Sequence, residues 1–452
     1  MDIKQFEGKN IAILGFWLEW KSTLNFLLNN NFAFKKLSVL DMKDQPWLES
    51  FWVGIETWEH YLEHLNDFDV IFKSAGVPYS KELQPFQDKI LTQVQFFFNN
   101  YKGKVITITA SKWKSTMTSI VYTILKNAWY NTKLVGNIGA PVLDEIDFNE
   151  EYDYVVCELS SYMLERLDKK NYISVLWNIF PEHMDWHGGF DNYAHAKLNN
   201  LKWAEYNFVL QKTVDEYDLL NQYDNIETYW IWGRTSWANG YFIHDNQELF
   251  PTDDKLLIWE HNIQNISLAI AIALKIGVPI DVIHETVKNF RGLPHRLELV
   301  WEVNGITFVD DAISTTPEST MEALKSFWKR VDTILLWGTN RGYDFRKLME
   351  MVQEYEIQNI VFFPPSGEIM SKYLNNFKWK ILYTDRMEDA VAFAFVNTEK
   401  WKICLLSTAS PSYSVWKNFE EKWNLFKEAI KKFEEETPKI ENNLPPVEEV
   451  LW

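Results

Sequence analysis

The sequence predicts an α/β protein whose sheets are mainly parallel. Short apolar runs rich in Val and Ile alternate along the chain with segments of helical spacing, which favours strand–helix–strand units. Polar loops follow several of these runs directly, as they do at the carboxyl ends of parallel strands. With 452 residues, the chain is long enough for two or three domains of this kind.

The elements can be placed in order from these runs. A strand over 10–14 and a helix over 21–29 open the first unit, and apolar side chains recur at helical spacing over 255–277. The tail 434–452 is acidic, contains proline and has few large apolar residues, so we expect it to be disordered. Further strands are expected near 37–40, 69–72, 104–109, 154–157, 173–176, 306–309, 332–336, 359–363 and 402–406.

Composition excludes several classes of function. The net charge is −18 and Lys and Arg do not gather in a stripe, so we expect no nucleic-acid partner. The sequence contains no run of about 18 apolar residues, and we therefore expect a cytoplasmic protein with no membrane partner. Cys157 and Cys404 lie in apolar runs, which is typical of buried thiols rather than of a disulfide framework or a zinc site.

Tryptophan and glycine occur in unusual numbers. The chain has 22 Trp and 17 Gly, whereas an average glycine usage of about 7% would give roughly 32. We hypothesise that most of these tryptophans are glycines in the organism, because a UGA codon that the cell reads as Gly is written as Trp by another translation table. A lineage that has accumulated Trp is the alternative. We expect Trp186 and Trp416 to be genuine and the following to be glycine: Trp17, Trp20, Trp113, Trp129, Trp259, Trp337, Trp401 and Trp423.

The segment 109–116, Thr-Ala-Ser-Lys-Trp-Lys-Ser-Thr, indicates a phosphate-binding loop after a strand. Lys114 suits the β- and γ-phosphates of ATP, and the hydroxyl of Ser115 or Thr116 suits Mg²⁺. Trp113 stands where the loop needs glycine, because the cradle requires positive φ and a close approach of the main chain. With glycine there, Ser111, Lys112 and residues 113–116 are predicted to bind ATP; a surface lysine at an ordinary helix start is the alternative.

Two further strand ends carry groups suited to a metal ion. Glu158 offers the hard oxygen ligands that Mg²⁺ prefers, although a carboxylate at a helix start is equally expected there. His183, Asp185 and His187 form a short cluster, but no further ligand completes a tetrahedral zinc set, and ordinary loop histidines are the alternative. Lys197 lies in a helical pattern, where a lone lysine is usually solvated.

These segments, in this order, resemble the Mur ligase family of ATP-dependent amide-forming enzymes over roughly residues 8–430. The family pattern has glycine at 17, 20, 113, 259, 337 and 423, which supports the recoding hypothesis. The resemblance implies a Rossmann-like UDP-sugar-binding domain over 1–100, a central P-loop ATPase-like domain over 101–292 and a Rossmann-like amino-acid-binding domain over 293–433, followed by the acidic tail 434–452. It rests on the turn at 15–22, on Lys114-Ser115-Thr116, Gly136-Asn137-Ile138-Gly139, Glu158-Leu159-Ser160-Ser161, His183-Met184-Asp185, Tyr193 to Lys197, Trp259-Glu260-His261-Asn262, Leu293-Pro294-His295-Arg296 and Asp310-Asp311.

The resemblance also implies roles for single residues. Lys114, His183, Lys197 and Arg296 would be catalytic, and Asn262, Arg296 and Asp311 would contact ATP together with the loop. Lys197 would be carbamylated, because a carbamate supplies oxygen ligands where an ammonium would repel the metal. The Mg²⁺ ligands would be Ser115, Glu158, His183 and Lys197. The substrate-binding residues would be Leu18, Glu19, Asp41, Lys43, Gly76, Asn137, Ser160, Thr315, Arg341, Ser412, Tyr413 and Phe419.

The implied reaction joins glutamate to UDP-N-acetylmuramoyl-L-alanine in peptidoglycan precursor synthesis. The substrate carboxylate would take the γ-phosphoryl group of ATP to give an acyl phosphate, and the amine of glutamate would then displace phosphate. We expect ATP and Mg²⁺ as cofactors and a monomeric enzyme.

Several positions depart from the family pattern. Ala110 replaces the first loop glycine, Ile313 a lysine, Thr339 an aspartate and Arg341 a lysine. Because most of these changes lie in the amino-acid half of the site, an L-glutamate-adding variant is an alternative, as are a sister Mur ligase and a folylpolyglutamate synthase. If Trp113 is genuine, its indole would fill the phosphate site and the chain would be a non-catalytic nucleotide-binding pseudoenzyme.

Overall fold

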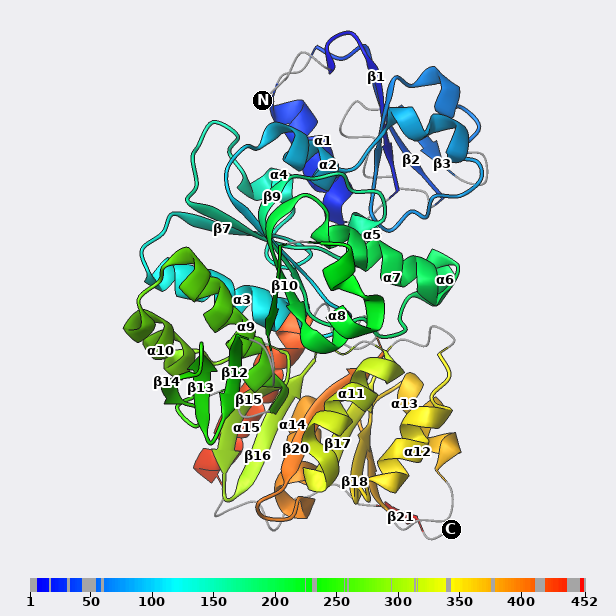
Figure 1. Ribbon diagram of the computed structural model, residues 1–452. Helices are drawn as coiled ribbons and strands as arrows, with labels where there is room; N and C mark the ends of the chain where they lie inside the picture. The colour runs from blue at the N-terminus through cyan, green and yellow to red at the C-terminus, as the bar shows by residue number, and fades with distance from the viewer. Residues whose placement is uncertain are drawn as a thin grey trace. The chain divides into compact units, whose positions relative to one another are not determined.

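The strands of the computed structural model form three sheets within the described residues, each built from one continuous part of the chain (Figure 1). Contacts divide the chain into two compact units, Met1–Phe290 and Arg291–Trp452, which are described separately below. The structure describes residues 6–15, 18–30, 33–42, 54–57, 61–223, 225–229, 234–255, 257, 260–293, 295–312, 314, 316–338, 343–374, 379–410, 419–436 and 448–450.

The first sheet is parallel and has the strand order β3-β2-β1-β4-β5. Its strand order reverses at β1, so the loops after β1, β2 and β4 meet at one edge, where open α/β sheets bind ligands. Ile13, Val39 and Leu27 pack with Phe96 in the core beneath that edge. The elements are β1 (Asn10–Leu14), α1 (Leu18–Asn29), β2 (Lys36–Asp41), β3 (Gly54–Thr57), β4 (Val70–Lys73), β5 (Ile90–Leu91) and α2 (Gln93–Asn100).

The second sheet has the order β14-β13-β12-β11-β10-β9-β6-β8-β7 and is parallel from β7 to β12. Helices cover both faces, which explains why β6 is buried along its whole length. Its strands are β6 (Val105–Thr109), β7 (Thr132–Gly136), β8 (Tyr154–Glu158), β9 (Asn171–Leu176), β10 (Ala204–Leu210), β11 (Ile226–Tyr229), β12 (Thr235–Ala238), β13 (Tyr241–His244) and β14 (Gln247–Pro251).

The helices of this part lie on opposite sides of the sheet. Val175 and Phe208 belong to the core formed with α3 and α9, whereas their neighbours Leu176 and Val209 pack against Tyr193 on α7. The helices are α3 (Lys114–Asn127), α4 (Val142–Glu145), α5 (Ser161–Leu164), α6 (Met184–His187), α7 (Phe190–Leu198), α8 (Gln211–Tyr217), α9 (Glu260–Ile276) and α10 (Ile280–Asn289).

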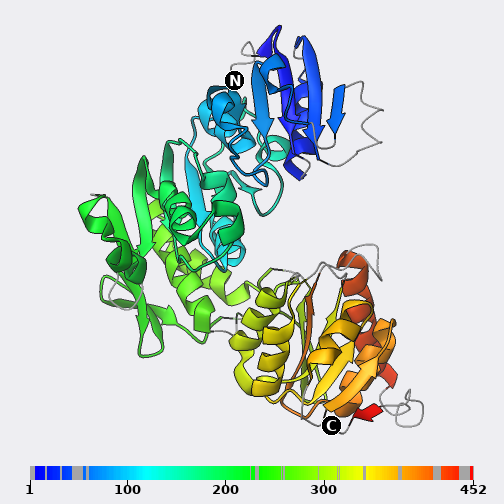
Figure 2. The ribbon, with the colours of Figure 1, turned by 90° about the vertical axis from the view of Figure 1, so that its right-hand side faces the viewer.

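The second unit contains the third sheet, whose strand order is β15-β16-β20-β17-β18-β19-β21. Helices α14 and α15 pack on one face, and α11 and α12 pack together on the other, as the yellow and red helices in Figure 2 show. The elements are β15 (Glu298–Val303), β16 (Ile306–Asp311), α11 (Pro317–Phe327), β17 (Val331–Trp337), α12 (Arg346–Glu354), β18 (Asn359–Phe362), α13 (Ser366–Met370), β19 (Trp379–Tyr383), α14 (Met387–Asn397), β20 (Ile403–Ala409), α15 (Phe419–Glu436) and β21 (Glu448–Val450).

The predicted α/β class with mainly parallel sheets is confirmed. Antiparallel pairing is confined, within the described residues, to β12–β14, β15–β16 and β19–β21. The expected disorder of the tail is wrong in part, because α15 continues to Glu436 and Glu448–Val450 extend the sheet beside β19. The described residues contain no helix that could span a bilayer.

Five tryptophans of the described residues have left-handed main-chain conformation: Trp113, Trp129, Trp203, Trp328 and Trp401, with φ of 62°, 66°, 60°, 49° and 69°. Left-handed φ is unfavourable for a bulky residue, by roughly 1–2 kcal/mol, and is ordinary for glycine. The indoles of Trp129 and Trp401 are also 94% and 75% exposed. The recoding hypothesis thus has backbone support at three expected positions and at two that the sequence did not single out.

Other expected glycine positions behave differently. Trp20 lies in α1 and Trp423 in α15, while Trp337 is buried in β17, so none of these three has a turn conformation that requires glycine. Trp17 and Trp259 lie outside the described residues, so at these positions, as at Trp20, Trp337 and Trp423, the glycine assignment stays a prediction. Trp416, which is expected to be genuine tryptophan, also lies outside them.

Candidate active site

The segment between β6 and α3 is the predicted phosphate loop. Asn178, just after β9, holds this loop in shape. Its Oδ1 accepts hydrogen bonds from the main-chain N–H of Ser111 at 3.0 Å and of Lys112 at 3.1 Å. The Lys114 ammonium donates to the Ser111 carbonyl at 3.2 Å and so lies back along the loop. Ser115 and Thr116 are buried in the first turn of α3.

Trp113 is the last residue of this loop and caps α3 with φ 62° and ψ 11°. The main chain therefore has the conformation that a glycine would supply, as the sequence predicted. The side chain is directed onto Trp177, with ring centroids 4.9 Å apart. An indole consequently occupies space beside a backbone turn that is otherwise shaped for an anion.

Glu158 ends β8 and is fully buried. The Asn137 side-chain amide donates to Glu158 Oε1 at 2.7 Å, while Oε2 has no hydrogen-bond partner among the described residues. A buried carboxylate oxygen left in this state suits a hard cation such as Mg²⁺. Gly136 makes this arrangement possible, because at φ +105° a Cβ there would lie 2.2 Å from the Glu158 carbonyl oxygen.

Lys197 lies on α7 with only 1% of its surface exposed. Its ammonium donates to the Ala110 carbonyl at 2.7 Å, which places it against the phosphate loop. Burial lowers the pKa of Lys197 well below its ordinary value, and Lys114 lowers it further, against the opposing effects of Glu182 and Glu158. This lysine is therefore not the solvated residue that a lone helical lysine usually is.

His183 caps α6 and itself has a left-handed φ of 52°. Desolvation lowers its pKa, with further lowering from Lys114, Lys197 and Lys112 and an opposing effect of Glu182. The imidazole is therefore neutral near pH 7, the form that ligates a metal. Glu182 also forms an ion pair with Lys112 of the loop.

The cluster of His183, Asp185 and His187, which the sequence already disfavours as a zinc site, has no structural support as one either. His183, Asp185 and His187 do not converge as ligands: within the described part of the chain, the group found at metal-binding spacing is His295, Glu298 and Asp310. The sequence analysis did not single out that group as a cluster.

The expected sugar-nucleotide residues lie at the ligand edge of the first sheet. Glu19 accepts a hydrogen bond from the Ala75 main-chain N–H at 3.2 Å, and burial raises the pKa of Glu19. Asp41 is buried at the end of β2. The carbonyl of Gly76 accepts a hydrogen bond from the Trp186 indole at 3.0 Å. These contacts join the loop after β4 to α1 on one side and to α6 on the other.

Two predicted contact residues have structural hydrogen bonds of their own. Ser160 caps α5, where its hydroxyl accepts from the Met163 N–H at 3.3 Å. On α9, the side chain of Asn262 is buried and its oxygen accepts from Asn265 at 3.1 Å. The side chain of Asn262 is thus held in one orientation.

In the second unit, Arg296 and Asp311 lie at the start and end of the β15–β16 hairpin. The Arg296 Nε is buried and has no hydrogen-bond partner among the described residues. Asp311 accepts from Ser407 at 2.8 Å. Burial, with a contribution from Asp310, raises the pKa of Asp311 to about 7, opposed by Ser314, Ser407 and Arg296.

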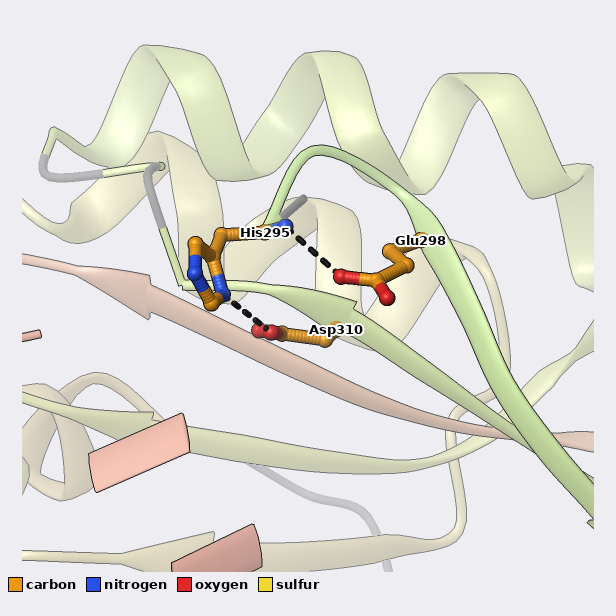
Figure 3. Close-up of side chains that lie close together, drawn as sticks. All are labelled: His295, Glu298 and Asp310. Atoms are coloured by element: carbon orange, nitrogen blue, oxygen red, sulfur yellow. Dashed lines mark hydrogen bonds and ion pairs between the residues drawn. The ribbon is translucent and has the colours of Figure 1, made fainter. Parts of the chain in front are cut away.

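His295 is anchored through both its side chain and its main chain (Figure 3). The ring Nδ1 lies 2.9 Å from Asp310 Oδ2, and the main-chain N–H donates to Glu298 Oε2 at 2.9 Å. The donor atoms of these three residues lie within 4.8 Å of one another, but Glu298 also pairs with Lys427 and Asp310 also accepts from Ala312. We therefore interpret the group as a hydrogen-bonded junction that holds the loop around Arg296.

Part of the predicted substrate site lies outside the described residues. This is the case for Lys43, Thr315, Arg341, Ser412 and Tyr413, and for the side chains of Leu18 and Phe419. Their expected roles stay predictions.

The central part of the chain matches a known family model. The Mur ligase middle domain covers residues 108–273, which include the phosphate loop, Glu158, His183 and Lys197. The UDP-N-acetylmuramoylalanine–D-glutamate ligase of Clostridium botulinum (strain Langeland) is 30% identical over 443 residues, which cover 91% of this chain and 94% of the relative. The chain belongs to the Mur ligase family.

Other Mur ligases give the same result. A ligase of the same name from Francisella tularensis subsp. holarctica is 29% identical over 79% of this chain and 84% of its own length. The solved UDP-N-acetylmuramate–alanine ligase of Thermotoga maritima shares the fold, with a TM-score of 0.56, 13% identity and coverage of 94% of this chain and 99% of that one. A MurF ligase from the same organism in complex with ADP has a TM-score of 0.54, 16% identity and coverage of 95% and 97%.

This Mur ligase is therefore an ATP-dependent ligase that forms amide bonds in peptidoglycan synthesis, as its motifs predicted.

Proposed function

We propose that this Mur ligase joins D-glutamate to UDP-N-acetylmuramoyl-L-alanine. The observation that carries the proposal is the similarity over nearly the whole chain to ligases of that name, in a molecule where Lys197 bonds to the phosphate loop and lies within electrostatic range of Glu158 and His183. Glu19, Asp41 and Gly76 are proposed to bind the UDP-sugar at the edge of the first sheet.

The residues of the loop fit ATP and Mg²⁺ if residue 113 is glycine. Bound ATP supplies the phosphoryl group that activates the substrate carboxylate. The N–H groups at the start of α3 and the Lys114 ammonium would hold the phosphates, and Glu158 and His183 would hold the metal through the orphaned Oε2 and the neutral imidazole. The other proposed ATP-binding residues are Ser111, Lys112, Ser115, Thr116, Asn262, Arg296 and Asp311.

Lys197 is proposed to act as a carbamate. Its depressed pKa favours the neutral amine, which is the form that adds CO₂, and the resulting anion would add an oxygen ligand for Mg²⁺ to the ligand atoms of Glu158 and His183. In ¹³C-bicarbonate buffer, we expect a carbamate carbon resonance from the enzyme that is missing from Lys197→Arg. An identical spectrum from both proteins would show that Lys197 is unmodified.

Residue 113 is proposed to be glycine in the native protein. The chain as translated should not bind ATP, whereas the Trp113→Gly variant should bind ATP in calorimetry and release phosphate with the two substrates. Trp129→Gly serves as the matched control, because it restores glycine at an exposed left-handed position outside the site and should leave ATP binding absent. Equal activity of the translated chain and Trp113→Gly would contradict this account, and UGG codons or tryptophan-containing native peptides at 113 would refute the recoding there.

The choice of amino acid is tested with the Trp113→Gly variant, here named the glycine-restored enzyme. Phosphate release dependent on UDP-N-acetylmuramoyl-L-alanine should require D-glutamate. Turnover with L-glutamate alone would establish the alternative specificity that Ile313, Thr339 and Arg341 leave open. If the enzyme binds ATP but turns over no amino acid, the remaining interpretation is a non-catalytic nucleotide-binding pseudoenzyme.

A further inference from the structure

Trp186 joins two loops that lie far apart in the sequence. It lies on α6, one helical turn after the cap residue His183, and its indole N–H donates to the Gly76 carbonyl at 3.0 Å. The two residues are 110 positions apart. The contact therefore connects the proposed metal-binding loop of the second sheet to the proposed UDP-sugar loop of the first sheet.

The loop that contains Gly76 is also held by Lys73. Lys73 is buried, and its ammonium donates to the carbonyls of Val77 at 2.6 Å and Ser74 at 3.1 Å. The same ammonium lies 4.4 Å from the Tyr79 ring centroid and 5.9 Å from that of Trp186. The Gly76 carbonyl is thus presented to the indole by a loop whose neighbouring carbonyls are already fixed.

The indole also packs on Tyr162. The ring centroids of Tyr162 and Trp186 are 4.6 Å apart, and those of Tyr162 and His183 are 5.0 Å apart. Tyr162 also stacks on His187 at an interplanar angle of 7°, and His187 in turn bonds to Ser161 at 3.0 Å. Tyr162 therefore lies in contact with both Trp186 and His183, and a shift of Trp186 would be transmitted to His183.

We propose that Trp186 is a positioning residue that couples the placement of the UDP-sugar loop to the orientation of His183. This inference rests on the proposed function, which assigns Gly76 to the sugar nucleotide and His183 to Mg²⁺. Tryptophan suits the role because it combines a ring N–H that reaches the carbonyl with a broad face that packs on Tyr162. The proposal also requires that residue 186 is genuine tryptophan and that its codon is UGG.

The test is made in the glycine-restored enzyme with Trp186→Phe, which keeps a ring against Tyr162 and removes the N–H. The Kd of UDP-N-acetylmuramoyl-L-alanine is measured by calorimetry with and without Mg²⁺ and a non-hydrolysable ATP analogue. The parent enzyme should bind the sugar nucleotide more tightly when the analogue is present, and Trp186→Phe should reduce that gain by about two- to tenfold, the range that one hydrogen bond contributes. Trp203→Phe, an exposed tryptophan outside the site, is the matched control and should keep the full gain.

Turnover supplies a second readout. Trp186→Phe should raise the KM for the sugar nucleotide at saturating ATP by a similar factor, and because coupling is reciprocal it should also raise the KM for ATP at saturating sugar nucleotide. An unchanged coupling factor and an unchanged KM in Trp186→Phe would overturn the positioning role while the proposed function stands. If the parent enzyme binds the sugar nucleotide but turns over no amino acid, the proposed function fails, and the calorimetric comparison still decides the role of Trp186.

Discussion

At the scale of single residues, the tryptophans fall into two groups that differ in backbone and surroundings. Trp129, Trp203, Trp328 and Trp401 have left-handed φ, and their indoles are 64% to 94% exposed. Trp186, by contrast, has its N–H bonded and its ring packed. The first four positions therefore suit glycine, whereas the position of Trp186 suits tryptophan.

This contrast predicts opposite effects of glycine substitution on stability. Trp129→Gly and Trp401→Gly should each raise the free energy of unfolding by about 0.5–1 kcal/mol, because relief of left-handed strain exceeds the extra entropy of an unfolded glycine. Trp186→Gly should lower it by about 3 kcal/mol or more through lost packing. Urea unfolding measures these changes. A loss of stability in both Trp129→Gly and Trp401→Gly would contradict the grouping.

Asp311 predicts a pH dependence of stability. Burial raises its pKa from 3.8 to about 7, so the folded chain retains a proton that the unfolded chain releases between those values. Stability contributed by this group is therefore present at low pH and is lost as the pH rises to about 7. Asp311→Asn should lose less Tm than the parent between about pH 5 and about pH 8 in calorimetry.

Asp344 supplies the control for this measurement. Its carboxylate is exposed, and the hydrogen bonds from Arg346 lower its pKa to about 2, so it does not titrate in the window. Asp344→Asn should show the pH profile of the parent. The same profile in Asp311→Asn would mean that Asp311 is ionised throughout.

At the scale of elements, strands with an apolar run buried in a sheet core were mostly predictable, whereas β10 and the strands toward one edge of the second sheet were not. β1, β6 and β17 each contain such a buried apolar run. The strands from β11 to β14 were missed, because they are short, partly exposed and mixed in composition near the edge of the second sheet. Their burial depends on neighbours that the local sequence does not reveal.

The candidate site shows the same limit. The position of Glu158 at a strand end was predictable from its local motif, and the left-handed turn at Trp113 followed from the loop pattern. The helix that carries Lys197 was predictable too, but the burial of its side chain was not, because a lone helical lysine is usually solvated. The contact of Trp186 with Gly76 and the junction at His295 were not, since both depend on partners brought together by the fold. Sequence spacing cannot report a hydrogen bond between residues 110 positions apart.

The pairing of β7 with β8 should depend on Gly136. Gly136→Ala adds a Cβ 2.2 Å from the Glu158 carbonyl oxygen at φ +105°, and we expect at least about 2 kcal/mol of destabilisation together with loss of turnover. Gly240→Ala is the matched control: its φ of +82° is also left-handed but the added Cβ meets nothing within 4 Å. It should cost only about 1 kcal/mol in urea unfolding and keep activity. Equal losses of unfolding free energy in Gly136→Ala and Gly240→Ala would contradict the steric role of Gly136.

At the scale of the whole molecule, the residues proposed for one reaction come from both compact units. Lys114, Glu158 and His183 belong to the first unit and Arg296 and Asp311 to the second. The UDP-sugar residues that the structure describes lie in the first unit alone. Binding of the sugar nucleotide and turnover should therefore respond differently to changes in the second unit.

Arg296→Ala tests this separation in the glycine-restored enzyme. We expect kcat to fall by roughly 100-fold or more, as when a charge-stabilising donor is removed, while the Kd of the sugar nucleotide is unchanged. Arg234→Ala, an exposed arginine paired with Asp245 in the first unit, should change neither quantity. A weaker Kd for the sugar nucleotide in Arg296→Ala would show that this arginine belongs to the nucleotide-sugar site.

The indole of Trp186 should serve as an intrinsic fluorescent probe of the sugar-nucleotide loop. In a native chain with most other tryptophans replaced by glycine, few fluorophores remain, and one of them touches the loop where the sugar nucleotide is proposed to arrive. Its emission should shift as the Gly76 carbonyl moves, so the unlabelled enzyme would report ligand arrival in real time.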